Sequence, residues 1–226
     1  MEQVKIGIIG CGGMGTHHAK TIHAMPEAIL IGVADTIAEK AAALAGELAT
    51  TAYTNFRELL PHVDGVMICT PPFERVDVVV DCAEAGVHIF AEKPIALDLT
   101  AADQMLAAAD KAGVVLLEAF MYRTHPQIER LNQLLADGAI GALRTVRSSF
   151  CYGLGPGYNV RIDRDLRGGG LYDVGCYCIN FSRMIAGDEP DDIQAVWTLG
   201  AETGVDETLG ASLHFPNGVV AQFDVG

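Results

Sequence analysis

The chain has 226 residues, half of them apolar, which suffices for one large or two small domains with a substantial core. Its formal net charge of −14 argues against nucleic-acid binding, because that needs a basic surface to displace counterions from phosphates. No apolar run approaches the roughly 20 residues that span a bilayer, and the first strand pattern begins too close to Met1 to leave room for a targeting peptide.

The first half of the sequence alternates between strongly apolar strand patterns and helix patterns. In chain order it predicts strands at 4–9, 28–34, 52–53, 65–69, 87–91 and 114–118, and helices at 14–25, 37–49, 56–60, 74–85 and 100–112. Thr100 is the expected N-cap of the last helix. Such strands, separated by helices, are typical of a parallel, doubly wound α/β sheet covered on both faces. Ligands bind at the carboxyl ends of these strands.

The pattern changes after about residue 120, where a second domain of α+β type is expected. It predicts helices at 126–136 and 171–185, an antiparallel-type strand at 144–151, a loop rich in glycine and charge at 153–170, and strands at 193–199, 208–215 and 219–225. The predicted domains are therefore residues 1–120 and residues 121–226.

A glycine-rich turn follows the first strand and matches G-x-G-x-x-G at Gly10, Gly12 and Gly15. Gly10 permits the tight turn, Gly12 lets the backbone approach a pyrophosphate, and Gly15 lets the helix pack closely on the strand. The helix directs its first N–H groups and its positive dipole end at the phosphates. We therefore predict a dinucleotide site that also includes Gly13 and Met14.

Asp35 ends the second strand, where an acidic residue would meet the adenosine ribose hydroxyls. The alternative is that Asp35 caps the helix that follows. An acidic residue repels a 2′-phosphate, and Thr36 follows it where an arginine would clamp one, so NAD is favoured. NADP stays open because Lys40 could reach a 2′-phosphate.

Two more strand ends carry candidates for the dinucleotide site, namely Thr70 with Pro71 and Glu92 with Lys93. Lys93, partly desolvated beside a cationic nicotinamide ring, could relay a proton. The alternative for Lys93 is a solvated lysine in an ordinary strand-to-helix turn.

Three glycines precede a helix pattern in which Asp173 and Tyr177 lie four residues apart and so share one helix face. A carboxylate that positions a substrate hydroxyl, beside a phenol that carries a proton, is a reasonable acid–base set. The alternative is an aspartate favoured by the helix dipole and a tyrosine packed in the core.

The cysteines and histidines are assigned no role in the chemistry of the site. The six cysteines contain no C-x-x-C pair and are expected to be free thiols in a reducing, cytoplasmic compartment. Cys176 and Cys178 form a C-x-C pair without a second cluster, and the seven histidines show no metal spacing, so no metal is expected. His17 and His18 lie in the first turns of the opening helix and are interpreted as part of a solvated helix face, with contact to a phosphate as the alternative.

Four motifs together carry a family resemblance. They are, in chain order, the turn at 10–15, Glu92-Lys93-Pro94, the run Glu118-Ala119-Phe120-Met121-Tyr122-Arg123-x-His125-Pro126-Gln127, and Gly-Gly-Gly-x-x-Asp-x-Gly-x-Tyr ending at Tyr177. With these motifs the chain resembles the Gfo/Idh/MocA oxidoreductases. The third motif resembles the branch with dihydrodiol dehydrogenases and NAD(P)-dependent D-xylose dehydrogenases.

The resemblance implies a Rossmann domain followed by an open antiparallel sheet that carries the substrate and often dimerises. It implies that Lys93 and Tyr177 handle a proton with Asp173 in support, and that Met121 and Arg123 line the substrate pocket. Family members are usually longer, so the second domain is expected to be incomplete relative to them, which would weaken it.

We therefore predict an NAD(P)-dependent oxidoreductase that moves hydride between nicotinamide and a hydroxyl of a sugar or cyclic diol, as a homo-oligomer through its second sheet. The rival hypothesis is a catalytically inactive dinucleotide-binding regulatory or scaffold protein of the same fold. A methyltransferase would leave Lys93 and the 168–177 run without a role. A short-chain dehydrogenase is disfavoured because no tyrosine is followed by a lysine four residues later.

Overall fold

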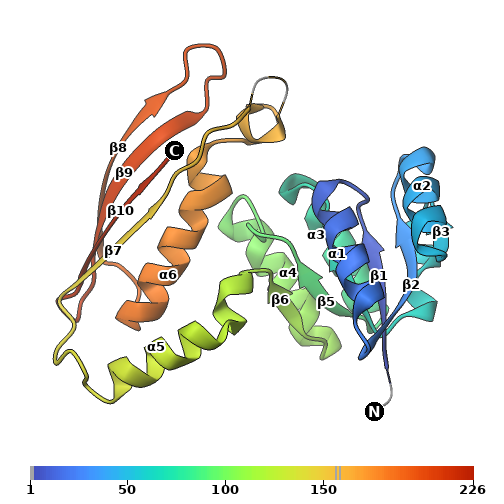
Figure 1. The fold of residues 1–226 in the computed structure, drawn as a ribbon, viewed down its shortest axis with the longest axis horizontal. Coiled ribbons are helices and arrows are strands. Elements are labelled where there is room, and N and C mark those ends of the chain that lie inside the picture. The colour runs from blue at the N-terminus through green and yellow to red at the C-terminus, as the bar shows by residue number, and fades with distance from the viewer. Residues whose placement is uncertain (1–2, 156, 158) are drawn as a thin grey trace. The chain divides into compact units, whose positions relative to one another are not determined.

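The computed structural model describes residues 3–155, 157 and 159–226, and its contacts divide the chain into two units, Met1–Ala119 and Phe120–Gly226 (Figure 1). Among the described residues, every helix is too short or too polar to cross a membrane. The six cysteines are free thiols.

The first unit is a sheet of six parallel strands in the order β3-β2-β1-β4-β5-β6. In chain order its elements are β1 (Val4–Ile9), α1 (Gly13–Ala24), β2 (Ala28–Ala34), α2 (Ala38–Leu48), β3 (Thr51–Tyr53), η1 (Phe56–Glu58), η2 (Leu60–His62), β4 (Gly65–Ile68), η3 (Pro72–Glu74), α3 (Arg75–Glu84), β5 (His88–Ala91), α4 (Leu99–Ala112) and β6 (Leu116–Glu118), where these η elements are 3₁₀ helices. The strand order reverses at β1, which lies between β2 and β4, and ligands bind at such a switch point.

Both faces of this sheet are buried. Neighbouring residues of β1 point to opposite faces: Ile8 packs with Ala19 of α1 and Leu44 of α2, whereas Ile9 packs with Val79 of α3 and Met105 of α4. A strand that is covered on both sides needs apolar residues at every position, which explains the continuous apolar runs. The prediction of a doubly wound parallel sheet is confirmed.

Two local predictions in this unit are wrong. The helix expected at 56–60 is instead two short 3₁₀ helices, η1 and η2, and Pro61 in the second has no N–H to continue an α-helix. The N-cap of α4 is Asp98 and not Thr100, because the Asp98 carboxylate accepts the N–H of Ala101 at 2.9 Å. The predicted end of this helix at residue 112 is confirmed, since α4 ends at Ala112 and its C-cap, Gly113, has a left-handed φ of 68°.

The second unit contains a four-stranded sheet in the order β7-β10-β9-β8, with α6 along one face (Figure 1). Its elements are η4 (Met121–Thr124), α5 (Pro126–Ala136), β7 (Thr145–Phe150), η5 (Val160–Ile162), η6 (Leu171–Gly175), α6 (Cys176–Ala186), β8 (Asp192–Leu199), β9 (Asp206–His214) and β10 (Val220–Val225). Cys178 of α6 packs with Val146 of β7, Leu213 of β9 and Phe223 of β10.

This sheet is mixed, so the prediction that it is antiparallel needs correction. β8, β9 and β10 are antiparallel neighbours, but β7 pairs with β10 in parallel. Alternating polarity in 144–151 shows only that one face of the strand is buried, and it does not fix the direction of a partner that lies far along the chain. The helix expected at 171–185 is also divided, because η6 is a π-helical turn that precedes α6.

Candidate functional site

The glycine turn joins β1 to α1, and two of its positions have no room for a side chain. Gly10 has a φ of 96°, and a Cβ there would lie 2.9 Å from the carbonyl carbon of Cys69. A Cβ on Gly15 would lie 1.8 Å from the carbonyl oxygen of Gly10. Because the atoms it would meet belong to the backbone, only glycine allows α1 to pack this closely on the turn.

The other two glycines of the turn face open space. A Cβ on Gly12 or Gly13 would have no heavy atom within 4 Å. Gly12 is the N-cap of α1, and within the described residues no side chain caps this helix and none in its first turn is acidic. The helix therefore presents backbone N–H groups and its positive dipole end to an anion. This geometry fits a dinucleotide pyrophosphate, and Met14 lies exposed beside it.

Asp35 is half-buried at the end of β2 and connects two loops. One carboxylate oxygen accepts the N–H of Cys11 at 2.7 Å, and the other accepts the N–H of Ile37 at 2.8 Å, just ahead of α2. The carboxylate therefore helps to start α2, although the N-cap residue itself is Ile37. Two carboxylate oxygens offer about four acceptor sites, so capacity remains for ribose hydroxyls.

Glu92 and Lys93 follow β5 and are joined to helix α1. One oxygen of the Glu92 carboxylate lies 2.8 Å from His18 Nε2, and the other accepts the N–H of Lys93 at 3.1 Å. The side chains of His18 and Glu92 are 23% and 12% exposed. The interpretation of His18 as part of a solvated helix face is therefore wrong, and its partner, distant in the sequence, left no signal in the helix pattern. The loop after Lys93 is also held by Glu118, whose carboxylate accepts the Ile95 N–H at 2.8 Å.

Arg75 is a site residue that the sequence pattern did not reveal. It is 1% exposed at the start of α3, and its guanidinium donates to the carbonyl oxygens of Thr70, Glu92 and Pro94. Burial lowers the pKa of Arg75 to about 10, with the charge of Glu92 opposing that shift. A signal was present, because Arg75 falls on the same helix face as the apolar positions 78, 79 and 82.

Asp173 lies in the π-helical turn of the second unit and accepts hydrogen bonds from two residues. The donors are the hydroxyl of Tyr152 and the guanidinium of Arg161, whose Nε is 3.1 Å from one carboxylate oxygen. Burial, followed by the hydrogen bond to Asp173, raises the pKa of Tyr152 to about 12. Both donors were missed, because they lie in or beside a segment that the sequence marks only as a loop of glycine and charge.

Tyr177 is the second residue of α6 and lies in a cluster of aromatic rings. Its hydroxyl donates to the Met121 sulfur at 3.5 Å, and its ring centroid is 5.3 Å from that of Phe120 and 5.6 Å from that of Phe150. Met121 is 67% exposed. The structure therefore brings together two residues that the resemblance singles out. Met121 was expected in the substrate pocket, and Tyr177 was expected to handle a proton.

Arg123 follows Met121 but lies in different surroundings. It lines a hollow of about 300 Å³ with Asn180 and Glu189, and the lining contains neither Asp173 nor Tyr177. Asn180 also accepts the hydroxyl of Tyr122 at 2.6 Å. The structure thus gives no support to a shared pocket for Arg123 and Tyr177.

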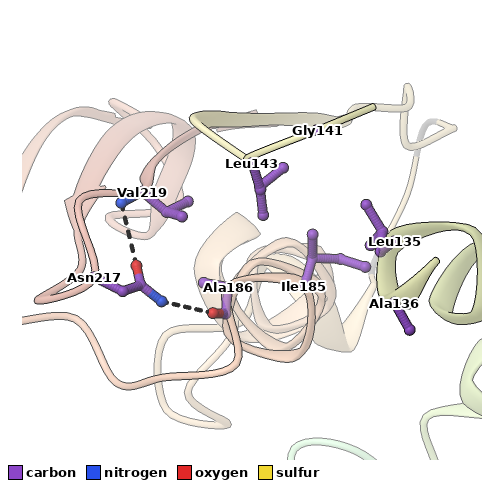
Figure 2. A pocket seen from close by; sticks show the side chains of 8 residues that line it. All are labelled: Leu135, Ala136, Gly141, Leu143, Ile185, Ala186, Asn217 and Val219. Carbon is purple, nitrogen blue, oxygen red and sulfur yellow. Dashed lines mark hydrogen bonds between the residues drawn. The ribbon is translucent and has the colours of Figure 1, made fainter. Parts of the chain in front are cut away.

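A second hollow, of about 380 Å³, contains none of the predicted site residues (Figure 2). Apolar side chains from α5, α6 and the segment before β7 line it, and Asn217 closes one side. The Asn217 amide donates to the Ala186 carbonyl at 2.8 Å and accepts the Val219 N–H at 3.2 Å. Its polar atoms are thus used within the turn and at the end of α6, so we assign the hollow no ligand.

The fold and the glycine turn together define an NAD-binding Rossmann protein, and comparison with known proteins extends this. Residues 4–120 match the oxidoreductase family GFO_IDH_MocA, described as an NAD-binding Rossmann fold, and residues 128–226 match the GFO/IDH/MocA C-terminal domain. The chain belongs to the Gfo/Idh/MocA family. The resemblance drawn from the four sequence motifs is confirmed.

Two kinds of named relative belong to the predicted branch. The chain is 34% identical to the D-xylose 1-dehydrogenase (NADP(+)) 2 of Haloferax volcanii, over 96% of this chain and 68% of that protein. It is 37% identical to the trans-1,2-dihydrobenzene-1,2-diol dehydrogenase of Mus musculus, over 76% of this chain and 52% of that protein. The chain therefore spans between half and about two thirds of these relatives' lengths.

Solved structures of the same fold include complexes with both dinucleotides. GenD2 from gentamicin A biosynthesis, in complex with NAD, has a TM-score of 0.90 at 27% identity and covers 99% of this chain and 66% of that one. A 3-ketoreductase from Actinomadura kijaniata, in complex with NADP and TDP-benzene, has a TM-score of 0.87 at 27% identity and covers 99% and 70%.

Proposed function

We propose that the chain is the dinucleotide-binding and catalytic part of an NAD(P)-dependent dehydrogenase that oxidises a hydroxyl of a sugar or cyclic diol. One observation carries the proposal: the 2.8 Å contact between His18 of α1 and Glu92. It holds Lys93 beside the helix that begins at the glycine turn. Because the same carboxylate accepts the Lys93 N–H at 3.1 Å, this contact supports a proton-handling role for Lys93 at the end of the sheet where a dinucleotide would bind.

In this proposal, different groups of the chain bind the dinucleotide, accept the proton and position the substrate. The 10–15 turn binds the pyrophosphate through backbone N–H groups, and the Asp35 carboxylate accepts hydrogen bonds from the ribose. When bound, the nicotinamide supplies the hydride acceptor. Deprotonated Tyr177 accepts the proton of the substrate hydroxyl and becomes the neutral phenol, and the positive charge of Lys93 favours the phenolate that this step needs. Asp173, held by Tyr152 and Arg161, positions the substrate hydroxyl.

We propose that NAD is the preferred dinucleotide. Both oxygens of Asp35 are fixed by backbone N–H groups, so the carboxylate cannot easily swing away from a 2′-phosphate, and it would repel one. NADP binding through Lys40 is the alternative, and the name of the Haloferax volcanii relative shows that this branch includes an NADP enzyme.

We also propose that the chain self-associates through the second sheet and works in the cytoplasm. On one face of β8, the apolar side chains of Ile193 and Trp197 are both 61% exposed. Such a patch marks an interaction surface. The six free thiols fit a reducing compartment. Sedimentation equilibrium measures the association, and a monomer at all concentrations would contradict it.

The test is a titration of the protein with NAD and NADP, followed by a turnover assay with pentoses, hexoses and cyclic diols. We expect tighter binding of NAD and reduction of NAD with at least one substrate class. Binding of NAD without turnover on the whole panel would support the rival regulatory or scaffold protein. If the protein binds neither NAD nor NADP, both the proposed dehydrogenase and the rival regulatory or scaffold protein are contradicted.

A further inference from the structure

The Arg75 guanidinium donates hydrogen bonds to two neighbouring loops. Its Nη2 donates to the Thr70 carbonyl at 2.5 Å, at the end of β4. Its Nη1 donates to the Glu92 carbonyl and, at 2.5 Å, to the Pro94 carbonyl, after β5. Nη1 also lies 3.5 Å from the Ile95 carbonyl oxygen, and the carbonyls of Glu92 and Pro94 lie on either side of Lys93 in the chain. One guanidinium therefore holds both flanks of Lys93 and ties them to the neighbouring strand end.

Stability alone does not explain an arginine in this place. The residue is 1% exposed, and burying a cation carries a free-energy penalty that neutral carbonyl acceptors only partly offset. Its Nε, moreover, is buried with no hydrogen-bond partner among the described residues. An apolar side chain of similar length would remove both penalties, although the three carbonyl oxygens would lose this donor. Such an apolar side chain could not, however, form hydrogen bonds that bridge the loops after β4 and β5.

Only arginine has the geometry for this bridge. Its planar guanidinium carries five donors in a rigid fork, so two nitrogens can serve different loops at the same time. A lysine at position 75 would offer one flexible ammonium, which can satisfy one loop but cannot hold the two in a fixed relation.

We propose that Arg75 is the positioning residue for Lys93: it fixes the 92–95 loop against the end of β4. This inference rests on the proposed function, in which Lys93 assists the proton transfer. A displacement of about 1 Å at a reacting group can reduce turnover about 10²-fold. We therefore expect the loss of Arg75 to affect turnover far more than dinucleotide binding.

The test compares Arg75→Met, Arg75→Lys and Lys93→Met with a control, Arg57→Met. Arg57 pairs with Asp81 on the surface and lies outside the loops in question, so the control makes the same chemical change without disturbing Lys93. We expect Arg75→Met to reduce kcat about 10²-fold, with the KM for NAD changed less than about threefold. Arg57→Met keeps the wild-type kcat, and Arg75→Lys recovers little of the lost turnover.

The double variant Arg75→Met with Lys93→Met separates positioning from a structural role. If Arg75 acts through Lys93, the double variant turns over as slowly as Lys93→Met alone, because the effects of coupled residues do not add. Losses that multiply, or a kcat of Arg75→Met equal to that of the wild type, would overturn the proposal.

A second measurement does not depend on activity. Amide hydrogen exchange of the 86–99 segment is expected to accelerate in Arg75→Met and to stay unchanged in Arg57→Met. If the wild type has no turnover but the exchange changes as expected, the proposed function fails and the loop-holding role of Arg75 stands. If turnover is present and the exchange is the same in both variants, Arg75 does not hold the loop.

Discussion

The replacement Gly15→Ala tests the close packing at the glycine turn, on which the dinucleotide site depends. The new Cβ would start 1.8 Å from the Gly10 carbonyl oxygen, and real Cβ contacts essentially never fall below 3.0 Å, so the two atoms must separate by at least 1.2 Å. Neither atom belongs to a flexible side chain. The separation therefore requires the N-terminus of α1 to move away from the turn.

The size of the effect follows from that displacement. An N–H···O hydrogen bond of about 2.9 Å that lengthens by the same amount reaches about 4 Å and is lost. A hydrogen bond to a charged group contributes about 1.5–3 kcal/mol, and each 1.4 kcal/mol is a factor of ten in Kd. The loss of one phosphate contact thus weakens NAD binding by about 10- to 100-fold. Overpacking of this kind also lowers the stability by about 1–3 kcal/mol.

The assay is calorimetric titration with NAD at a temperature where both proteins are folded, combined with thermal melting. The control is Gly46→Ala, at an exposed position in α2 where a Cβ meets no atom within 4 Å. Because alanine is the better helix former, we expect this control to gain up to about 1 kcal/mol of stability and to bind NAD as the wild type does. Wild-type affinity and melting temperature in Gly15→Ala would refute the packing argument.

Three further predictions concern other parts of the chain. Lys93→Met is expected to leave NAD binding largely intact and to reduce turnover at least about 10²-fold; steady-state kinetics with calorimetric binding checks this, and near-normal turnover removes Lys93 from the mechanism. Asp98→Ala is expected to cost about 1 kcal/mol, because the N-cap bond to Ala101 is lost; chemical denaturation measures it, and an unchanged midpoint would show that the cap is dispensable. Burial raises the pKa of Tyr122 from 10.0 to about 12, so the folded state keeps the proton that the unfolded state releases, and its contribution to stability is present below pH 10.0 and is lost as the pH rises to about 12. Unfolding titrations over that range should show a smaller decline in Tyr122→Phe, and an equal decline would assign the alkaline loss to other groups.

The first unit was predictable because its signals are local. Apolar runs such as Ile6–Ile9 mark strands that are buried on both faces, and the spacing of Gly10, Gly12 and Gly15 marks a turn whose backbone demands glycine. The N-cap of α4 was predicted wrongly because two nearby residues satisfy the same capping rule. Asp98 and Thr100 are both good capping residues, and only the backbone geometry decides between them.

The second sheet was less predictable, because its pairing is not local. A strand with one buried face, such as 144–151, alternates in the same way whether its partner is parallel or antiparallel. β7 meets β10 only after α6, β8 and β9 have intervened. The direction of that pair depends on the path of the whole unit and not on residues in either strand.

The parts of the site that the sequence did not reveal are contacts between polar residues far apart in the chain. His18 and Glu92 are 74 residues apart, and Arg75 bonds to carbonyl groups whose positions depend on the fold and not on side-chain identity. Motifs show the residues that meet the ligand, because the chemistry of the ligand restricts them. The residues that hold those groups in place are restricted only by the geometry of the folded chain. A buried charge on an apolar helix face is then the informative signal: Arg75 breaks the apolar pattern of its own helix, and its guanidinium donates to loops outside that helix.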